Sequence, residues 1–157
     1  MGDDVKAADF FTRGYANAQQ PFQVWTETPR GGTVNFITGA GGFLQSVIFG
    51  YGGVRIQQDG LLLAPSAPPA GTDSVKLVGV KYRGVSLDIE IDARHIVVAA
   101  TGVGAGAGAA TATGAGAGAG SVLELVNAAT GAVVAVLTAS PTKVARGARF
   151  RIVQQKQ

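Results

Sequence analysis

Val85-Ser86-Leu87-Asp88-Ile89-Glu90-Ile91-Asp92 decides the fold, because apolar and polar residues alternate strictly along it. A period of two places every second side chain on the same face of a β-strand. One face is therefore predicted to be buried and the other to face water, as in an antiparallel β-sandwich. Arg83-Gly84 is predicted to form a tight hairpin turn to an earlier strand that holds Val75, Leu77 and Tyr82.

Further apolar runs on both sides are predicted to be strands of the same sandwich. A segment at residues 101–120 interrupts them, because all but four of its positions are Gly or Ala. A silk-like stack is one interpretation. A flexible, low-complexity insertion is favoured, because such a stretch buries little apolar surface. The other predicted strands lie at residues 54–56, 61–63, 95–100, 122–126 and 133–137, with a last strand through Phe150 and Ile152.

A first helix is predicted over residues 5–18, ahead of the strands. Asp4 is its predicted N-cap, and Pro21 is predicted to end it, because proline disfavours helical backbone in the residue before it. Its buried side is predicted to carry Phe10, Phe11 and Tyr15.

A second helix is predicted from residue 36 to residue 50, because its apolar residues recur at offsets of three and four. Asn35 is its predicted N-cap, and the glycines at 50, 52 and 53 are predicted to end it. Residues 31–54 carry no charge, but their eight glycines favour a buried helix over a membrane span. The apolar face is predicted to consist of Phe36, Ala40, Phe43, Leu44, Val47, Ile48 and Tyr51.

These patterns together predict an α+β chain with two parts. Residues 1–53 would form a helical lead-in, and residues 54–157 an antiparallel β-sandwich with the Gly/Ala insertion at 101–120.

The charge pattern separates the end of the chain from the rest. Residues 1–100 hold eight basic and nine acidic residues, whereas residues 101–157 hold five basic residues and one acidic residue. Nucleic-acid binding is one interpretation of this basic tail. Solvent-facing strand positions are favoured, because the charges are dispersed among apolar residues, so no nucleic-acid or membrane partner is expected. The tail residues are Lys143, Arg146, Arg149, Arg151 and Lys156.

Two features that the sequence lacks bear on the kinds of site and on the location of the protein. The sequence has no cysteine, so disulfides and thiolate metal sites are excluded. No apolar signal segment follows Met1, so the location stays open, with the cytoplasm as one option.

Metal and phosphate sites are weakly indicated at best. His95 is the only histidine and lacks a second imidazole to share a metal. Asp88, Glu90 and Asp92 could bind calcium, but solvent-facing carboxylates explain them equally well. The run at residues 39–42 resembles a phosphate-binding loop but lacks the glycine spacing and a nearby lysine. No metal or cofactor is therefore predicted.

One segment, Phe22-Gln23-Val24-Trp25-Thr26-Glu27, has the residue types of a sugar-processing site. An aromatic ring offers an apolar platform to a pyranose face, and a carboxylate can take a proton or polarise water. Taken by composition alone, Glu27 is more simply interpreted as an exposed loop glutamate.

Residues 22–56 resemble the end of the catalytic domain of glycoside hydrolase family 65. The motifs that carry the resemblance are Val-Trp-Thr-Glu at 24–27, Val-Asn-Phe-Ile-Thr-Gly at 34–39 and Gly-Gly-Phe-Leu-Gln at 41–45. The likeness covers about residues 5–100. It implies that residues 1–53 end an (α/α)6 barrel that holds the active site and that a β-sandwich follows.

The resemblance also implies roles for three residues. Glu27 matches the general base of the family's hydrolases, and Trp25 and Thr26 would bind substrate beside it. The family's phosphorylases hold phosphate here with a loop that bears His and Ser, and this sequence has neither at that place. Hydrolysis with inversion is therefore expected, with the two carboxyl groups about 6.5–9.5 Å apart.

The general acid is missing from the residues before Glu27, because the resemblance places it earlier in the barrel. The chain is therefore expected to be a C-terminal fragment of an α-glucoside hydrolase, inactive without an upstream barrel domain. Its expected substrate is a glucosyl disaccharide unit, such as trehalose, kojibiose or glucosyl-galactosyl-hydroxylysine, either free or on a glycosylated protein.

Two alternatives remain. The chain could be a free-standing β-sandwich that binds carbohydrate or has a structural role, without catalysis. It could also be a Gly-Ala-rich structural protein, although the Gly-Ala tract forms only one insertion. An exposed apolar face on helix 36–50 would count against the free-standing sandwich.

Overall fold

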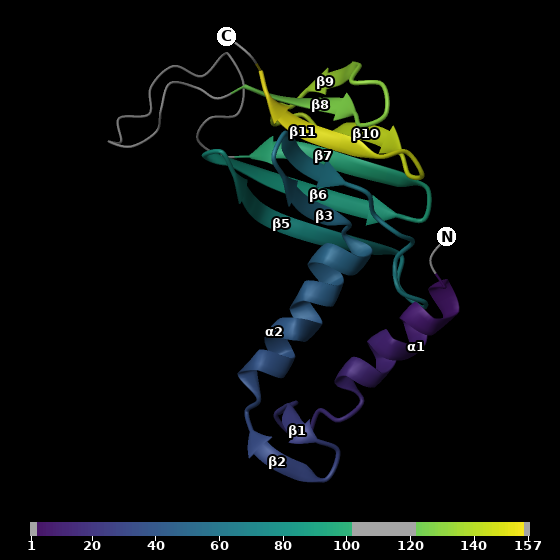
Figure 1. The fold of residues 1–157 in the computed structure, drawn as a ribbon, viewed down its shortest axis with the longest axis vertical. Coiled ribbons are helices and arrows are strands. Elements are labelled where there is room, and N and C mark those ends of the chain that lie inside the picture. Colours follow the sequence, from purple (N-terminus) through teal and green to yellow (C-terminus); the bar gives the residue numbers. More distant parts are fainter. Residues whose placement is uncertain (1–2, 102–121, 156–157) are drawn as a thin grey trace. The chain divides into compact units, whose positions relative to one another are not determined.

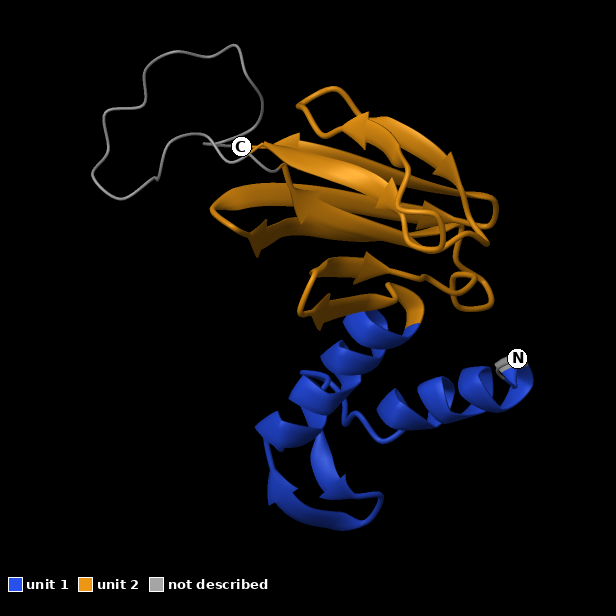
Figure 2. Cartoon of the chain, turned by 45° about the horizontal axis from the view of Figure 1, so that its top comes forward, with its two compact units in different colours: residues 1–50 blue, residues 51–157 orange. Residues whose placement is uncertain are grey.

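The computed structural model describes residues 3–101 and 122–155, so most of the predicted Gly/Ala insertion lies outside the described residues. The chain divides into two compact units, residues 1–50 and residues 51–157 (Figure 2). The first unit contains the helix α1 (Asp4–Tyr15), the strands β1 (Thr26–Thr28) and β2 (Gly31–Val34), and the helix α2 (Ile37–Gln45). A π-helical segment, η1 (Ser46–Tyr51), follows α2.

The second unit is a β-sandwich of two antiparallel sheets, as the alternation predicted (Figure 1). One sheet has the strand order β10-β7-β6-β5, and the other has the order β3-β4-β11-β8-β9. The strands are β3 (Val54–Gln57), β4 (Gly60–Leu63), β5 (Ser74–Tyr82), β6 (Val85–Asp92), β7 (His95–Thr101), β8 (Leu123–Asn127), β9 (Val133–Val136), β10 (Thr142–Ala145) and β11 (Phe150–Gln154).

The core of the sandwich lies between the two sheets. Strand β6 supplies four side chains that are at most 1% exposed, while the acidic residues between them are half-buried. These four are Val85, Leu87, Ile89 and Ile91, as predicted. The turn before β6 is also as predicted, because Arg83 and Gly84 both have positive φ, which is typical of a two-residue hairpin turn.

Helix α1 is shorter than predicted and is capped by a different residue. The cap is Asp3 rather than Asp4, since the Asp3 carboxylate accepts a hydrogen bond of 3.0 Å from the Lys6 amide. The helix ends at Tyr15 rather than at residue 18. Phe10 and Tyr15 are 62% and 44% exposed, so their predicted burial is wrong in the described part of the chain.

Helix α2 differs from its prediction in how it begins and in what covers it. Asn35 has φ +53° and does not cap it; Phe36 occupies the cap position without a side-chain hydrogen bond. No residue of α2 or η1 is buried within the described part of the chain, so the predicted buried helix is not observed there. Within residues 3–101 and 122–155, no helix is long and apolar enough for a membrane span.

Candidate functional site

Glu27 lies in the middle of β1, with its side chain exposed to solvent. Its Oε2 atom accepts hydrogen bonds from the Thr33 amide at 3.2 Å and from the Thr33 hydroxyl at 3.3 Å. Its Oε1 atom accepts no hydrogen bond from the residues that the structure describes. One carboxylate oxygen is thus held by the protein, and the other is free to accept a proton from water.

A β-bulge in β2 brings Thr33 to this carboxylate. Thr26 pairs with Val34 and Thr28 pairs with Gly31, so Gly32 and Thr33 together oppose the single residue Glu27. The sequence indicated no more than an exposed loop for Glu27 and did not predict the bulge. The Gly31-Gly32 pair is the signal in the sequence that fits it.

Trp25 anchors the strand that carries Glu27. Its indole N–H donates a hydrogen bond of 2.9 Å to the carbonyl oxygen of Gly14, and its ring centroid lies 5.3 Å from that of Phe43. Phe43 also stacks on Phe11 and meets Tyr15 edge-on. Trp25 is therefore half-buried among residues of α1 and α2. Its contact with substrate stays a prediction.

Thr26 is half-buried beside Trp25, and its hydroxyl is used within the hairpin. The hydroxyl donates a hydrogen bond of 2.8 Å to the carbonyl oxygen of Thr28. Its lone pairs remain the groups that could accept from a sugar hydroxyl. The substrate-binding role of Thr26 also stays a prediction.

The acidic row on β6 is occupied by contacts within the sandwich. Asp88 accepts a hydrogen bond of 2.9 Å from the Gly79 amide, and Glu90 lies 4.0 Å from the Lys76 ammonium group. Asp92 is the last residue of β6. Among residues 3–101 and 122–155, no group of three or more acidic or histidine side chains could hold a metal ion. The calcium alternative therefore has no support there.

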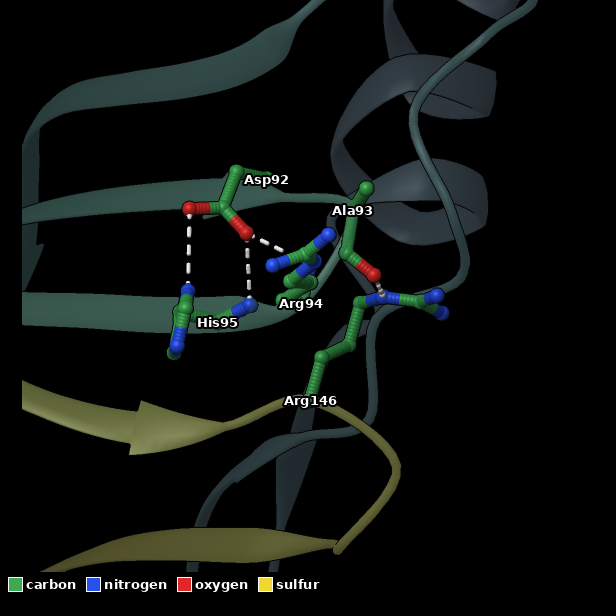
Figure 3. A network of polar contacts seen from close by, with 5 residues as sticks. All are labelled: Asp92, Ala93, Arg94, His95 and Arg146. Carbon is green, nitrogen blue, oxygen red and sulfur yellow. Dashed lines mark hydrogen bonds and ion pairs between the residues drawn. The ribbon is translucent and has the colours of Figure 1, made fainter.

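Asp92 organises the turn between β6 and β7 (Figure 3). One carboxylate oxygen accepts hydrogen bonds of 2.6 Å from the amides of Arg94 and His95, and the other lies 3.3 Å from the His95 Nδ1 atom. Arg146 donates from Nε to the carbonyl oxygen of Ala93 at 2.9 Å. The hydrogen bonds from the Arg94 and His95 amides lower the pKa of Asp92 below its ordinary value of 3.8.

The hydrogen bonds that the Asp92 carboxylate accepts are expected to stabilise the sandwich in a way that depends on pH. Because the folded state lowers the pKa of Asp92, the contribution is present above pH 3.8 and is lost as pH falls through the lower folded pKa. The Asp92→Asn variant is expected to lose less unfolding free energy than wild type between about pH 4 and pH 2. Urea unfolding at several pH values, followed by far-ultraviolet circular dichroism, measures this difference. Parallel curves for both proteins would contradict it.

Two residues of the basic tail are used within the sandwich. Arg146 contacts Ala93 as described above. Arg151 forms an ion pair with Asp59 and donates a hydrogen bond of 2.9 Å to the carbonyl oxygen of Ala128. These contacts support a structural role for both residues, and Lys156 lies outside the described residues.

The chain is similar to curated glucosidases and hydrolases. It is 53% identical over 78 residues to a protein-glucosylgalactosylhydroxylysine glucosidase of Dictyostelium discoideum, an alignment covering 49% of this chain and 11% of the relative. The protein-glucosylgalactosylhydroxylysine glucosidase of Danio rerio is 40% identical over 100 residues, which cover 63% of this chain and 15% of the relative. A kojibiose hydrolase of Mucilaginibacter mallensis is 38% identical over 81 residues, which cover 51% of this chain and 12% of the relative.

These relatives are members of glycoside hydrolase family 65, so the resemblance inferred from the motifs is confirmed. The chain spans between 11% and 15% of the length of these relatives. No protein-family model matches the chain. No solved structure matches it significantly.

Proposed function

We propose that this chain is the part of an inverting α-glucoside hydrolase that supplies the general base, Glu27. The observation that carries the proposal is the exposed Glu27 carboxylate with one free oxygen, in a chain similar to glucosidases of glucosyl disaccharides. The expected substrate is a glucosyl disaccharide unit, such as kojibiose, trehalose or the glucosyl-galactose unit of a glycosylated hydroxylysine.

Glu27 would act on the water molecule that attacks the sugar. The carboxylate takes a proton from this water as the oxygen attacks the anomeric carbon from the face opposite the leaving group. A carboxylic acid about 6.5–9.5 Å away then gives its proton to the leaving oxygen. Asp3 and Asp9 do not fit this acid, because they form ion pairs with Lys6 and Arg13 on α1.

The acid would come from a part of the protein beyond this chain, since the relatives are several times longer. In this proposal residues 1–53 form the end of an (α/α)6 barrel whose earlier helices carry the acid. The sandwich of residues 54–157 supports that barrel without taking part in catalysis, and the chain alone is inactive.

Exposed apolar side chains in the first unit support a larger helical domain. Ile37 and Leu44 on α2 are 80% and 60% exposed, and Phe22 before β1 is 85% exposed. Large apolar side chains that are this exposed on a small unit are typical of a surface that another part of a protein covers. The same exposure counts against a free-standing carbohydrate-binding sandwich, which would have to leave these side chains in water.

The stereochemistry of the product tests the proposal. The complete gene product that contains this chain is expected to release glucose from kojibiose, with β-glucose as the first anomer formed, because a single displacement inverts the α-linkage. Proton nuclear magnetic resonance (NMR) within the first minutes, before the anomers equilibrate, measures it. First-formed α-glucose would contradict inversion, and no glucose from kojibiose, trehalose or glucosyl-galactose would contradict the hydrolase itself.

A further inference from the structure

We propose that Thr33 is a positioning residue for Glu27 and that the β2 bulge exists to present it. This inference rests on the proposed function, because it concerns how the general base is held. Both donors of Thr33, the amide and the hydroxyl, point to the same oxygen, Oε2 of Glu27. Fixing one oxygen with two donors restricts rotation of the carboxylate, so that the free oxygen keeps one direction.

The bulge accounts for the unusual use of the Thr33 amide. In a regular antiparallel pair, an amide opposite Glu27 would donate to a backbone carbonyl or point to solvent. Since Gly32 and Thr33 together oppose Glu27, the ladder is interrupted and the Thr33 amide turns to the side chain. Bulges that redirect a side chain in this way recur next to active sites.

Gly32 fits this arrangement for two separate reasons. Its φ of +85° lies in the left-handed region that glycine adopts without strain. A glycine in this conformation is typical of the first residue of a G1 bulge. A Cβ atom at residue 32 would also lie 2.9 Å from the Glu27 Cβ atom and 3.0 Å from Oε2. A larger residue would therefore push the carboxylate away from Thr33.

The geometry of the contact leaves the second oxygen of Glu27 open. Both hydrogen bonds from Thr33 go to Oε2. Neither bond uses Oε1, so water can still approach it. Thr33 therefore orients the base without competing for the oxygen that takes the proton.

The kinetic test compares four variants of the complete gene product. Thr33→Val removes the hydroxyl at nearly constant volume, and Thr33→Ser restores it. Thr28→Val is the matched control, because this hydroxyl of the same hairpin donates to the Gly31 carbonyl and does not contact Glu27. Glu27→Gln tests the base itself.

We expect Thr33→Val to lower kcat for glucose release by about 10- to 100-fold with KM within about twofold of wild type. Thr33→Ser and Thr28→Val should stay within about threefold.

A second measurement tests the contact in the 157-residue chain without any activity. The Thr33 amide proton resonance is expected to shift in Glu27→Gln, because a neutral amide replaces the charged acceptor, and to move much less in Thr28→Val. A Thr33 amide resonance that stays unchanged in Glu27→Gln would overturn the contact.

The outcomes separate the two proposals. If Thr33→Val keeps full kcat while Glu27→Gln is inactive, the positioning role is wrong and the proposed function stands. If Glu27→Gln is as active as wild type, or wild type releases no glucose, both are wrong. A loss of kcat in Thr28→Val equal to that in Thr33→Val would also overturn the positioning role, because disruption of the hairpin would then explain both.

Discussion

Replacing Glu27 with glutamine is expected to lower kcat/KM for glucose release from kojibiose by about 10²- to 10⁴-fold. The amide has nearly the size of the carboxylate and can still accept hydrogen bonds from Thr33, but it cannot take a proton from water. A loss of this size corresponds to about 3–5 kcal/mol of transition-state stabilisation. Initial rates of glucose release by the purified complete gene product measure it.

The matched control is Glu124→Gln, which makes the same chemical change on β8 of the sandwich. It is expected to leave kcat/KM within about twofold of wild type, because Glu124 lies in the other unit and the proposed mechanism does not use it. A fall in kcat/KM of less than about tenfold in Glu27→Gln would contradict the role of Glu27 as base.

Chemical rescue separates a base from a carboxylate that only supports the fold. In the proposed mechanism, Glu27→Ala leaves space beside the anomeric carbon, and azide is a nucleophile that needs no deprotonation. Azide should therefore restore turnover in this variant by direct displacement, giving β-glucosyl azide while the leaving oxygen takes its proton from the acid. Glu27→Ala that stays inactive at every azide concentration would favour a structural role.

The sandwich could be predicted because the alternation that favours a strand locally is also the pattern that gives the whole sheet one buried face. Along β6, the period of two in the sequence is the same pattern that separates a core face from a wetter face. The Arg83-Gly84 turn could be predicted because glycine readily adopts the positive φ that a two-residue hairpin turn requires; in the structure Arg83 adopts a positive φ as well. Strand β10 was missed, because Thr142-Lys143-Val144-Ala145 alternates over only four residues and carries one clearly apolar side chain.

The first unit was harder to predict. Periodicity predicts an apolar face for α2, but it does not say what covers that face, so the helix was expected to be buried and is not. Glu27 was singled out through a motif, whereas its hydrogen-bond partner Thr33 was not. Contact between Glu27 and Thr33 depends on a one-residue shift in strand pairing, and a motif of residue types does not encode such a shift.

At Gly53, too, the sequence indicates less than the structure shows. The sequence marked it as part of a helix stop, and its φ of +60° is consistent with that role. In the structure it is also buried against the segment after β4. Its carbonyl accepts a hydrogen bond of 3.1 Å from the Ala64 amide, and a Cβ atom there would lie 2.2 Å from the carbonyl carbon and oxygen of Ala64.

Gly53→Ala is therefore expected to lower the unfolding free energy of the sandwich by about 3 kcal/mol or more. A left-handed backbone costs a non-glycine residue about 1–2 kcal/mol, and the clash adds to this because its partner is backbone that cannot rotate away. Urea unfolding followed by far-ultraviolet circular dichroism measures the change in the strands. Trp25 is the only tryptophan and lies in residues 1–50, so its fluorescence reports on the other unit.

Gly131→Ala is the control that separates the cost of positive φ from the cost of the contact with Ala64. Gly131 has φ +72°, similar to Gly53, but among the residues that the structure describes no atom lies in contact with the position of its Cβ, within 4 Å. Its alanine variant should lose only the backbone contribution, about 1–2 kcal/mol. Since φ is nearly matched, the difference between the two variants measures the contact with Ala64. Equal losses would mean that the chain after β4 moves aside at no cost, and that Gly53 is required for its conformation alone.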